Sequence, residues 1–454
     1  MEVDVTEIQT GELGGTSTSK RPVVRQLRRL AVIAAGFAVL FVGLILAALP
    51  MIPGGFPGIV LGLTILSTEL NWARKLRAKV LRTARRALPN ISWRRAVRFL
   101  PGRGNPFRGA TSSERAAVVG ATSEGISRAA GVLRRGGLVA FPTETVYGLG
   151  ASVFNRRAVG RIFEVKGRPA DNPLIVHVSS RAMLDGVVRD VPDTASRLME
   201  AFWPGPLTLV LRRSRRVPGI VSAGLDTVAV RVPADPVALQ LIRLTGQPIA
   251  APSANRSGRP SPTTAEHVMR DLGAVVNLVI DGGPTPIGVE STVVDVTGAV
   301  PVLLRPGGIS KEAIEQVIGA SLCSGPVSGP ARSPGNRHRH YAPACQVIPV
   351  DPCGWEEALQ RVRQAGGQIG VVARTTPEFL DETVAYYRSI PGDETEYARH
   401  LFAAFREAED AGVDSLLVET VQETGVGLAV MDRLHRAAAI DDTPDHPEEA
   451  IRDN

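Results

Sequence analysis

An uncharged stretch of 39 residues, Leu30–Thr68, constrains this chain more than any other feature of its sequence. Because one membrane crossing takes ~20 apolar residues, the stretch is long enough for two crossings joined by a turn. Proline and glycine interrupt it near its middle, in the run Pro50–Gly58 (PMIPGGFPG). We therefore predict a transmembrane helical hairpin within residues 30–100, in which the segment 53–68 either crosses fully or is re-entrant.

Basic residues flank the stretch on both sides. The positive-inside rule places both flanks in the cytoplasm, which requires an even number of crossings and fits a hairpin in the cell membrane. The alternatives are a cleaved signal peptide and a soluble pair of buried helices. A signal peptide starts with a short basic segment, whereas residues 1–29 form a polar arm with four acidic residues. The flanking cations are Lys20, Arg21, Arg25, Arg28 and Arg29 before the stretch and Arg74, Lys75, Arg77, Lys79, Arg82, Arg85 and Arg86 after it.

The segment after the hairpin is basic and then rich in turn-forming residues. Arg74–Arg98 fits either an amphipathic helix on an anionic leaflet or a solvated basic linker. Residues 101–113 (PGRGNPFRGATSS) predict a linker. The Pro–Gly turn together with Ile59–Arg74 resembles the small PGPGW family of transmembrane proteins, with the motif altered here to PGGFPG.

The net charge of +7 belongs entirely to the N-terminal quarter. Residues 1–110 hold 17 Lys or Arg and 5 Asp or Glu, so they carry +12, and residues 111–454 carry −5. Counterion release from nucleic acid needs a basic face, so the charge of the larger part gives no support for direct nucleic-acid binding. The three cysteines are too few for a disulfide framework and lack the CxxC spacing of a zinc site.

Residues 114–323 alternate helical and strand patterns, which is typical of an α/β domain. Helical periodicity runs over 118–135, and short apolar runs predict strands after it. Many of these runs end in a polar residue, which suits a site assembled at strand ends. The predicted strands are 137–141, 174–178, 207–211, 228–232, 249–252 and 293–296.

This domain contains none of the motifs GxxxxGK[ST], GxGxxG, HExxH or GxSxG. A nucleotide would therefore be held by dispersed cationic side chains. Lys166 and Arg168 are candidates, because i, i+2 spacing in an extended segment puts both on one face. By themselves they fit a solvated turn better than a nucleotide site, since surface cations are usually solvated. Their case is strengthened by Ser253 and Asn255, a small polar pair that directly follows a predicted buried strand.

Five motifs of this domain resemble the YrdC/Sua5 family, the threonylcarbamoyl-AMP synthases. The KxR and SxN signatures of that family are intact. The run Ser333–Pro343 (SPGNRHRHYAP) resembles the linker of the two-domain Sua5 branch, so the resemblance extends over residues 114–440. The motifs are PTETVYGLG (142–150), KGRPADNPLIVHV (166–178), WPGPLT (203–208), APSANRS (251–257) and GVESTVVD (288–295).

The resemblance implies an α/β fold, with a YrdC-like twisted-sheet catalytic domain and a small Rossmann-like Sua5 domain. It implies a nucleotidyltransferase that condenses L-threonine, bicarbonate and ATP into L-threonylcarbamoyladenylate and pyrophosphate, for the t6A modification of tRNA. ATP is then a substrate, Mg²⁺ comes with it rather than from a protein metal site, and the proteins that transfer the threonylcarbamoyl group to tRNA are downstream partners. The reaction needs charge neutralisation and positioning rather than a covalent nucleophile.

The same motifs imply roles for individual residues. Lys166 and Arg168 are the implied catalytic residues, and Arg231 is implied to hold the threonine carboxylate. Apart from its motif, His177 would be taken for an ordinary core histidine. The implied ATP contacts are Lys166, Arg168, Asn172, Thr227, Ser253, Asn255, Ser261, Arg305 and Tyr341, and the implied L-threonine contacts are Thr145, His177, Arg231 and Ser291.

Residues 324–343 are rich in Ser, Pro, Gly and Arg and fit either a plain linker or, as the resemblance implies, a lid that covers the active site. Residues 344–440 alternate strand and helix, which predicts a small Rossmann-like parallel sheet. The acidic tail 441–454 is predicted to be disordered. In the C-terminal domain the predicted strands are 346–350, 368–373 and 414–419, and the predicted helices are 355–365, 394–411 and 427–438.

Two other functions fit parts of the sequence. A YrdC-like fold on a membrane anchor could serve as an RNA- or ribosome-binding module, but the charge of −5 over residues 111–454 opposes it. A membrane scaffold with a decayed catalytic domain is opposed by the intact KxR and SxN pairs.

The hairpin can be tested by its topology. Reporter fusions after Lys20 and after Arg98 should both report the cytoplasm, because two crossings return the chain to its starting side. Reporters in opposite compartments would mean a single crossing and would contradict the hairpin.

Overall fold

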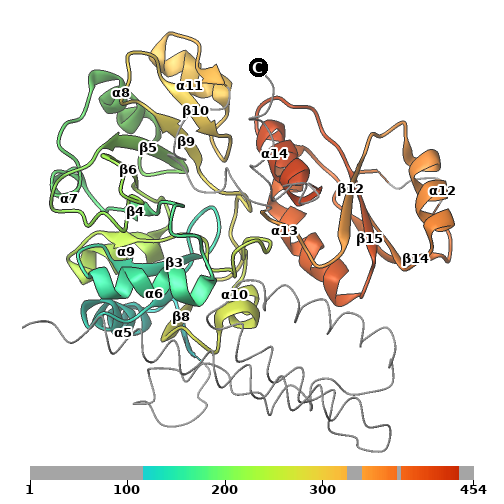
Figure 1. Cartoon of the computed structure of the whole chain (residues 1–454), viewed down its shortest axis with the longest axis horizontal. Coiled ribbons are helices and arrows are strands. Elements are labelled where there is room, and N and C mark those ends of the chain that lie inside the picture. Colours follow the sequence, from blue (N-terminus) through green and yellow to red (C-terminus); the bar gives the residue numbers. More distant parts are fainter. Residues whose placement is uncertain (1–115, 325–339, 376–379, 439–454) are drawn as a thin grey trace, which may run out of the picture. The chain divides into compact units, whose positions relative to one another are not determined.

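The computed structural model describes residues 116–324, 340–375 and 380–438, which all belong to one compact unit, Ser113–Asn454. The predicted arm, hairpin, first linker and acidic tail lie outside the described residues, as does most of the second linker. Within the described ranges, no helix combines the length and the apolar character that a bilayer crossing requires. Figure 1 shows these ranges in colour. Residues 116–324 correspond to the domain that the motifs predict to be catalytic, and we call them the catalytic lobe. We call residues 340–438 the C-terminal lobe.

The first elements of the catalytic lobe differ from the prediction. A strand, β1 (Ala117–Gly120), precedes a shorter helix, α5 (Ser123–Arg134), where the sequence pattern predicted a single helix over 118–135. The prediction failed because β1 pairs in parallel with β8 (Leu278–Asp281), a partner far away in the sequence. The helix begins after Thr122, whose side chain accepts a hydrogen bond from the Gly125 amide at 3.1 Å.

Eleven strands form one mixed sheet in the order β1-β8-β2-β3-β7-β4-β6-β5-β9-β10-β11. Parallel pairs such as β4 with β6 stand beside antiparallel pairs such as β5 with β6. The predicted strands are confirmed, although the one predicted over 249–252 has only two residues. The strands not yet given are β2 (Val139–Phe141), β3 (Gly148–Ser152), β4 (Ile175–His177), β5 (Leu207–Arg212), β6 (Thr227–Arg231), β7 (Ile249–Ala250), β9 (Thr292–Asp295), β10 (Val302–Arg305) and β11 (Cys323–Ser324).

Helices cover the sheet, and side-chain caps begin most of them. In α9, for example, Asp235 accepts a hydrogen bond from the Ala238 amide at 2.9 Å, and Pro236 occupies the first turn. Helices α5 and α9 pack together on the face of the sheet formed by the odd-numbered residues of β2. The helices not yet given are α6 (Arg156–Lys166), α7 (Arg181–Leu184), α8 (Asp193–Phe202), α9 (Pro236–Thr245), α10 (Ala265–Leu272) and α11 (Lys311–Ile318).

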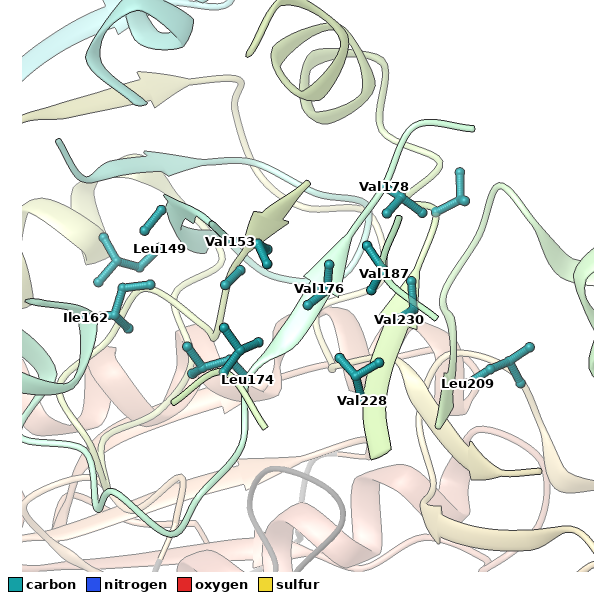
Figure 2. Close-up of a cluster of buried hydrophobic side chains, with 14 of the residues drawn as sticks. Leu149, Val153, Ile162, Leu174, Val176, Val178, Val187, Leu209, Val228 and Val230 are labelled. Carbon is teal, nitrogen blue, oxygen red and sulfur yellow. The ribbon is translucent and has the colours of Figure 1, made fainter. Parts of the chain in front are cut away.

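Strands β4 and β6 divide their side chains between two faces. The even-numbered valines of both strands enter the main hydrophobic core, where Figure 2 shows them among side chains from β3, α6 and β5. Ile175 and Ala229 belong to a separate small cluster on the other face. Because side chains alternate along a strand, His177 and Arg231 share the face of Ile175 and Ala229. The pattern that fills the core therefore presents two polar side chains on the opposite face.

The C-terminal lobe contains a four-stranded parallel sheet in the order β12-β15-β13-β14. Figure 1 shows α12 on one side of it and α13 and α14 on the other, as in a doubly wound fold. The predicted elements are confirmed, but β14 was missed, because every second residue of this edge strand is exposed. The elements are β12 (Gln346–Val350), α12 (Trp355–Ala365), β13 (Ile369–Ala373), β14 (Val384–Ser389), α13 (Glu394–Asp410), β15 (Ser415–Glu419) and α14 (Gly427–Ala438).

Two buried arginines of the C-terminal lobe pair with carboxylates of the catalytic lobe. Arg406 of α13 lies 2.9 Å from Asp271, and its side chain is 1% exposed. Arg433 of α14 lies 2.9 Å from Glu290, and its side chain is 0% exposed. Removal of one partner from such a pair leaves a buried charge without compensation, so both pairs specify how the lobes dock.

The main core can be tested with Leu209, a β5 side chain that is fully buried. Leu209→Ala should lower the free energy of unfolding by ~2–5 kcal/mol, because it removes buried methyl groups and leaves a cavity. Urea denaturation of the full chain measures this loss. Val300→Ala is the control, since Val300 is 54% exposed. Equal effects of the two substitutions would contradict the assignment of the core.

Candidate active site

A cavity of about 50 Å³ lies where the parallel strands β4 and β6 end, and most of the predicted site residues line it. Ligand sites of α/β sheets occur at the carboxyl ends of strands. The predicted residues that do not line the cavity are Lys166, Asn172, Thr227, Asn255 and Ser261. The predicted residues that line it are Thr145, Arg168, His177, Arg231, Ser253, Ser291, Arg305 and Tyr341.

The segment around Lys166 and Arg168 is not extended, as the spacing argument assumed. Lys166 is the last residue of α6, and Gly167 caps the helix in the left-handed conformation, with φ of 63°. A glycine adopts this conformation without steric cost, and Arg168 then leaves the helix as the chain turns. Both cationic side chains are nevertheless buried.

Lys166 fixes the loop that follows β7. Its Nζ donates hydrogen bonds to the main-chain oxygens of Ser253, at 2.5 Å, and of Asn255. The Ser253 hydroxyl in turn donates to the Asn255 side chain at 2.6 Å. Burial lowers the pKa of Lys166 well below its ordinary value, and the nearby Arg168 adds to the effect. The lysine of the KxR signature and both residues of the SxN signature thus form one hydrogen-bonded group at the cavity wall, and Arg168 lines the cavity beside it.

Two buried guanidinium groups stand at the cavity with neutral oxygens as their hydrogen-bond acceptors. Arg168 donates to the side chain and the main-chain oxygen of Asn172 and to the main-chain oxygen of Pro173, at 2.5–3.1 Å. Arg305 donates to the main-chain oxygen of Ser291 at 2.9 Å and to its hydroxyl at 3.2 Å. Burial lowers the pKa of Arg168 to about 9, so its charge persists at neutral pH. Neither group pairs with a carboxylate within the described residues.

Arg231 is held from three sides at the end of β6. Its Nη1 donates to the Thr145 hydroxyl at 2.9 Å and its Nε to the main-chain oxygen of Gly205 at 3.0 Å. Its Nη2 lies 2.6 Å from Glu144, which also accepts a hydrogen bond from the Ala234 amide at 2.9 Å. Burial opposes the charge of Glu144, but Arg231 keeps the pKa of this carboxyl below its usual value. Glu144 was not among the predicted site residues, although it lies within the PTETVYGLG motif.

His177 lines the cavity as a neutral imidazole. Burial, together with the positive charge of Arg231, lowers its pKa to about 3. Its Nδ1 is buried and has no hydrogen-bond partner in the described part of the chain. The ring meets Phe141 edge-on, with 6.2 Å between the ring centroids. A buried polar atom without a partner is costly, so this nitrogen is available for a ligand.

Ser261 is linked to the cavity through Glu290. The Ser261 hydroxyl donates to one carboxylate oxygen of Glu290 at 2.5 Å, and Arg433 of the C-terminal lobe binds the other. Neither Glu290 nor Arg433 was predicted. Glu290 could have been found only through the GVESTVVD motif, and Arg433 has no local signal, because its partner is 143 residues away in the chain. Thr227 begins β6 and does not line the cavity. Unlike the other predicted residues outside the lining, it makes no described hydrogen bond to a residue that lines the cavity.

Tyr341 lies at the start of the C-terminal lobe and closes one side of the cavity. Its ring stacks on Phe402 with a centroid distance of 5.4 Å, and the Arg433 guanidinium carbon lies 5.3 Å from its centroid. Its φ is 65°, a left-handed conformation that costs free energy for a residue with a large side chain. These contacts hold the strained residue in place.

Comparison with known protein families matches three segments of the chain. Residues 131–307 match the Sua5/YciO/YrdC family, described as telomere recombination. Residues 309–439 match the C-terminal domain of threonylcarbamoyl-AMP synthase. Residues 29–83 match the PGPGW family of transmembrane proteins.

Individual relatives agree with these matches. The threonylcarbamoyl-AMP synthase of Pyrococcus abyssi is 50% identical over 321 residues, which cover 68% of this chain and 93% of the relative. That of Bacillus subtilis is 46% identical and covers 69% and 92% of the two chains. The crystal structure of P. abyssi Sua5 complexed with L-threonine has a TM-score of 0.68 at 47% identity, covering 72% of this chain and 98% of that one. This chain therefore belongs to the Sua5/YrdC family of threonylcarbamoyl-AMP synthases, in its two-domain form.

Proposed function

We propose that the chain catalyses the reaction for which its relatives are named, the synthesis of L-threonylcarbamoyl-AMP. The threonine amine combines with bicarbonate to give a carbamate and water. A carbamate oxygen then attacks the α-phosphorus of ATP, and the bond to the β-phosphate oxygen breaks to release pyrophosphate. No bond to the protein forms, so the residues are needed to position the reactants and to offset charge. The product is the activated donor for the t6A modification of tRNA.

The two guanidinium groups without carboxylate partners are the observation that carries this proposal. Arg168 and Arg305 are buried, remain charged and bind only neutral oxygens of the protein. A buried cation of this kind attracts an anion, and a guanidinium fork matches phosphate oxygens. We assign these two residues to the phosphates of ATP. They would offset the charge that moves onto pyrophosphate as the α–β bond breaks.

Lys166, Ser253 and Asn255 act together in this proposal. Because Lys166 holds the loop of Ser253 and Asn255, it fixes the Ser253 side chain at the cavity wall. Asn172 similarly fixes Arg168, and Ser261 acts beside Glu290. These contacts support a role for Lys166 in positioning the ATP-binding wall, in addition to the ATP contact that its motif implies. Thr227 stays a proposed ATP contact that rests on its motif alone.

A second group of lining residues suits L-threonine. Arg231 donates one hydrogen bond from Nε and one from Nη1, whereas its Nη2, close to Glu144, has no hydrogen-bond partner in the described residues. N–H groups on both terminal nitrogens are therefore open to a carboxylate. His177 Nδ1 and the hydroxyls of Thr145 and Ser291 can serve the hydroxyl and amine of threonine. We therefore assign Thr145, His177, Arg231 and Ser291 to L-threonine.

Magnesium would enter with the phosphates of ATP. In the ranges that the structure describes, no three His, Cys, Asp or Glu side chains gather to hold a metal ion. Glu290, which lines the cavity, is already paired with Arg433, and Glu144, which does not line it, is paired with Arg231. We derive no step that depends on a metal site in the protein.

Residues 340 and 341 act as part of a lid in this proposal. The cavity volume of about 50 Å³ is far below the ~300–1,000 Å³ of typical small-molecule sites. His340 and Tyr341 form part of its lining, so their displacement would make room for ATP. A closed lid would exclude water from the product, a mixed anhydride that hydrolyses readily. The rest of the linker, residues 325–339, lies outside the described part of the chain.

The N-terminal match to the PGPGW family supports association with a membrane. We propose that residues 30–100 anchor the enzyme as a hairpin, with the active site on the cytoplasmic side, where ATP and tRNA are found. The domain boundaries predicted from the sequence remain part of this proposal.

Arg168→Ala should abolish synthesis while the protein stays folded. Loss of a charge-assisted contact to the transferring phosphate costs about 3 kcal/mol, which is more than a hundredfold in rate. The assay incubates the purified full chain with ATP, L-threonine and labelled bicarbonate and measures pyrophosphate and the labelled adenylate. Arg156→Ala, an exposed arginine at the other end of α6, is the matched control. Unchanged turnover in Arg168→Ala would contradict the assignment, and a wild-type chain without threonine-dependent pyrophosphate would contradict the function.

His177 gives the folded state a pH dependence. Its pKa is about 3 in the folded protein and near 6.5 in the unfolded chain, so the unfolded chain binds more protons between these values. The contribution of His177 to stability is therefore complete above pH 6.5 and is lost progressively as the pH falls toward 3. Melting temperatures measured from pH 7.5 to 5 should fall, and they should fall less steeply for His177→Gln. Identical slopes for the two proteins would show that His177 is not buried as a neutral group.

A further inference from the structure

Arg433 belongs to the C-terminal lobe, yet it contacts two groups that form the wall of the catalytic cavity. Its Nε donates to Glu290 at 2.9 Å, and its guanidinium carbon lies 5.3 Å from the centroid of the Tyr341 ring. Glu290 and Tyr341 both line the cavity, whereas Arg433 stands behind them. On its own helix, Arg433 donates to Asp432 at 2.7 Å, which fixes the orientation of the guanidinium plane.

Arg406 is a matched comparison, because it pairs with a carboxylate across the lobe interface but not with one that lines the cavity. It lies in the same lobe, it is as deeply buried, and it also pairs with a carboxylate of the catalytic lobe, Asp271. Asp271 lies in α10 and does not line the cavity. Both arginines thus hold the lobes together, but only Arg433 holds residues of the cavity.

We propose that Arg433 is a positioning residue for the ATP half of the reaction, through which the C-terminal lobe completes the active site. This inference rests on the proposed function. Arg433 keeps the Glu290 carboxylate turned away from the phosphates and toward Ser261, which donates to its other oxygen. It also holds Tyr341, in its strained conformation, against the cavity.

Charge explains why ATP binding should depend on this arginine. Glu290 is adjacent to Ser291, whose main-chain oxygen and hydroxyl bind Arg305. Besides Arg433, Arg305 is a positive charge that lowers the pKa of Glu290, and Arg305 is the group we assign to phosphate. Without Arg433, the carboxylate would compete with ATP for the guanidinium and repel the phosphates. Threonine binding at Arg231 should be affected much less, because Arg231 has its own carboxylate, Glu144.

The experiment compares Arg433→Met with Arg406→Met in the full chain. Each substitution leaves one buried carboxylate unpaired at the lobe interface, so their costs in melting temperature should be similar. The readouts are the KM for ATP at saturating threonine, the KM for threonine at saturating ATP, and ATP binding measured by calorimetry. Arg433→Met should raise the KM for ATP about tenfold more than Arg406→Met does, with a change of about twofold or less in the KM for threonine.

If Arg433→Met fails to fold, the variant Arg433→Lys provides the test. A lysine restores the charge opposite Glu290 but not the planar contact with Tyr341, so this variant should fold and still bind ATP less tightly. The inference would be overturned if Arg433→Met and Arg406→Met bound ATP with equal affinity. If Arg433→Met fails to fold, it would be overturned by an Arg433→Lys variant that binds ATP as tightly as the wild type. A wild-type chain that binds ATP without forming the adenylate would instead overturn the proposed function, and the calorimetric comparison would still test Arg433.

Discussion

Burial of Arg168 and Arg305 without carboxylate partners imposes a condition on the rest of the catalytic lobe. A guanidinium in such a place must find neutral oxygen acceptors, and main-chain oxygens are free only where the chain leaves the sheet. The acceptors of Arg168 lie in the loop before β4, and the main-chain acceptor of Arg305 lies directly before β9. The cationic wall can therefore form only at strand ends. This explains how the family binds a triphosphate with short motifs from distant loops instead of one glycine-rich loop.

Two carboxylates, Glu290 in the cavity lining and Glu144 beside the lining residue Arg231, have different consequences for the construction of the cavity. Glu144 is paired with Arg231 inside the catalytic lobe, so the group of residues that suits threonine is complete within one lobe. Glu290 is paired with Arg433, so the charge balance at the group that suits phosphate depends on the other lobe. Each carboxylate is neutralised by an arginine that is not assigned to phosphate. The surplus of positive charge consequently stays on Arg168 and Arg305, the two residues that we propose for the phosphates of ATP.

The sequence predicted what depends on local patterns and motifs, and it failed where distant contacts decide. Alternation identified six strands of the catalytic lobe and most elements of the C-terminal lobe, but helices α6–α11 and several strands of the catalytic lobe were not predicted. Strand β1 was taken for helix because its partner, β8, is remote in the chain. Motif resemblance supplied the residues that line the cavity, yet the spacing argument for Lys166 and Arg168 assumed an extended segment that is in fact a helix end. Arg433 could not be predicted at all. Its role follows from the docking of two lobes, which no local spacing records.

Because side chains alternate along β4 and β6, the positions of the site residues depend directly on the packing of the core. Site residues carried on loops would depend on it less. In β4, Val176 fills the core and the next residue, His177, lines the cavity, and Val230 and Arg231 repeat this pair in β6. The two strands are in parallel register, with His177 opposite Arg231. A slip by one residue would turn the valines toward the cavity and the polar side chains into the core, at a cost in both places. The hydrophobic packing that makes the register unique is therefore also what holds the imidazole and the guanidinium side by side over the cavity.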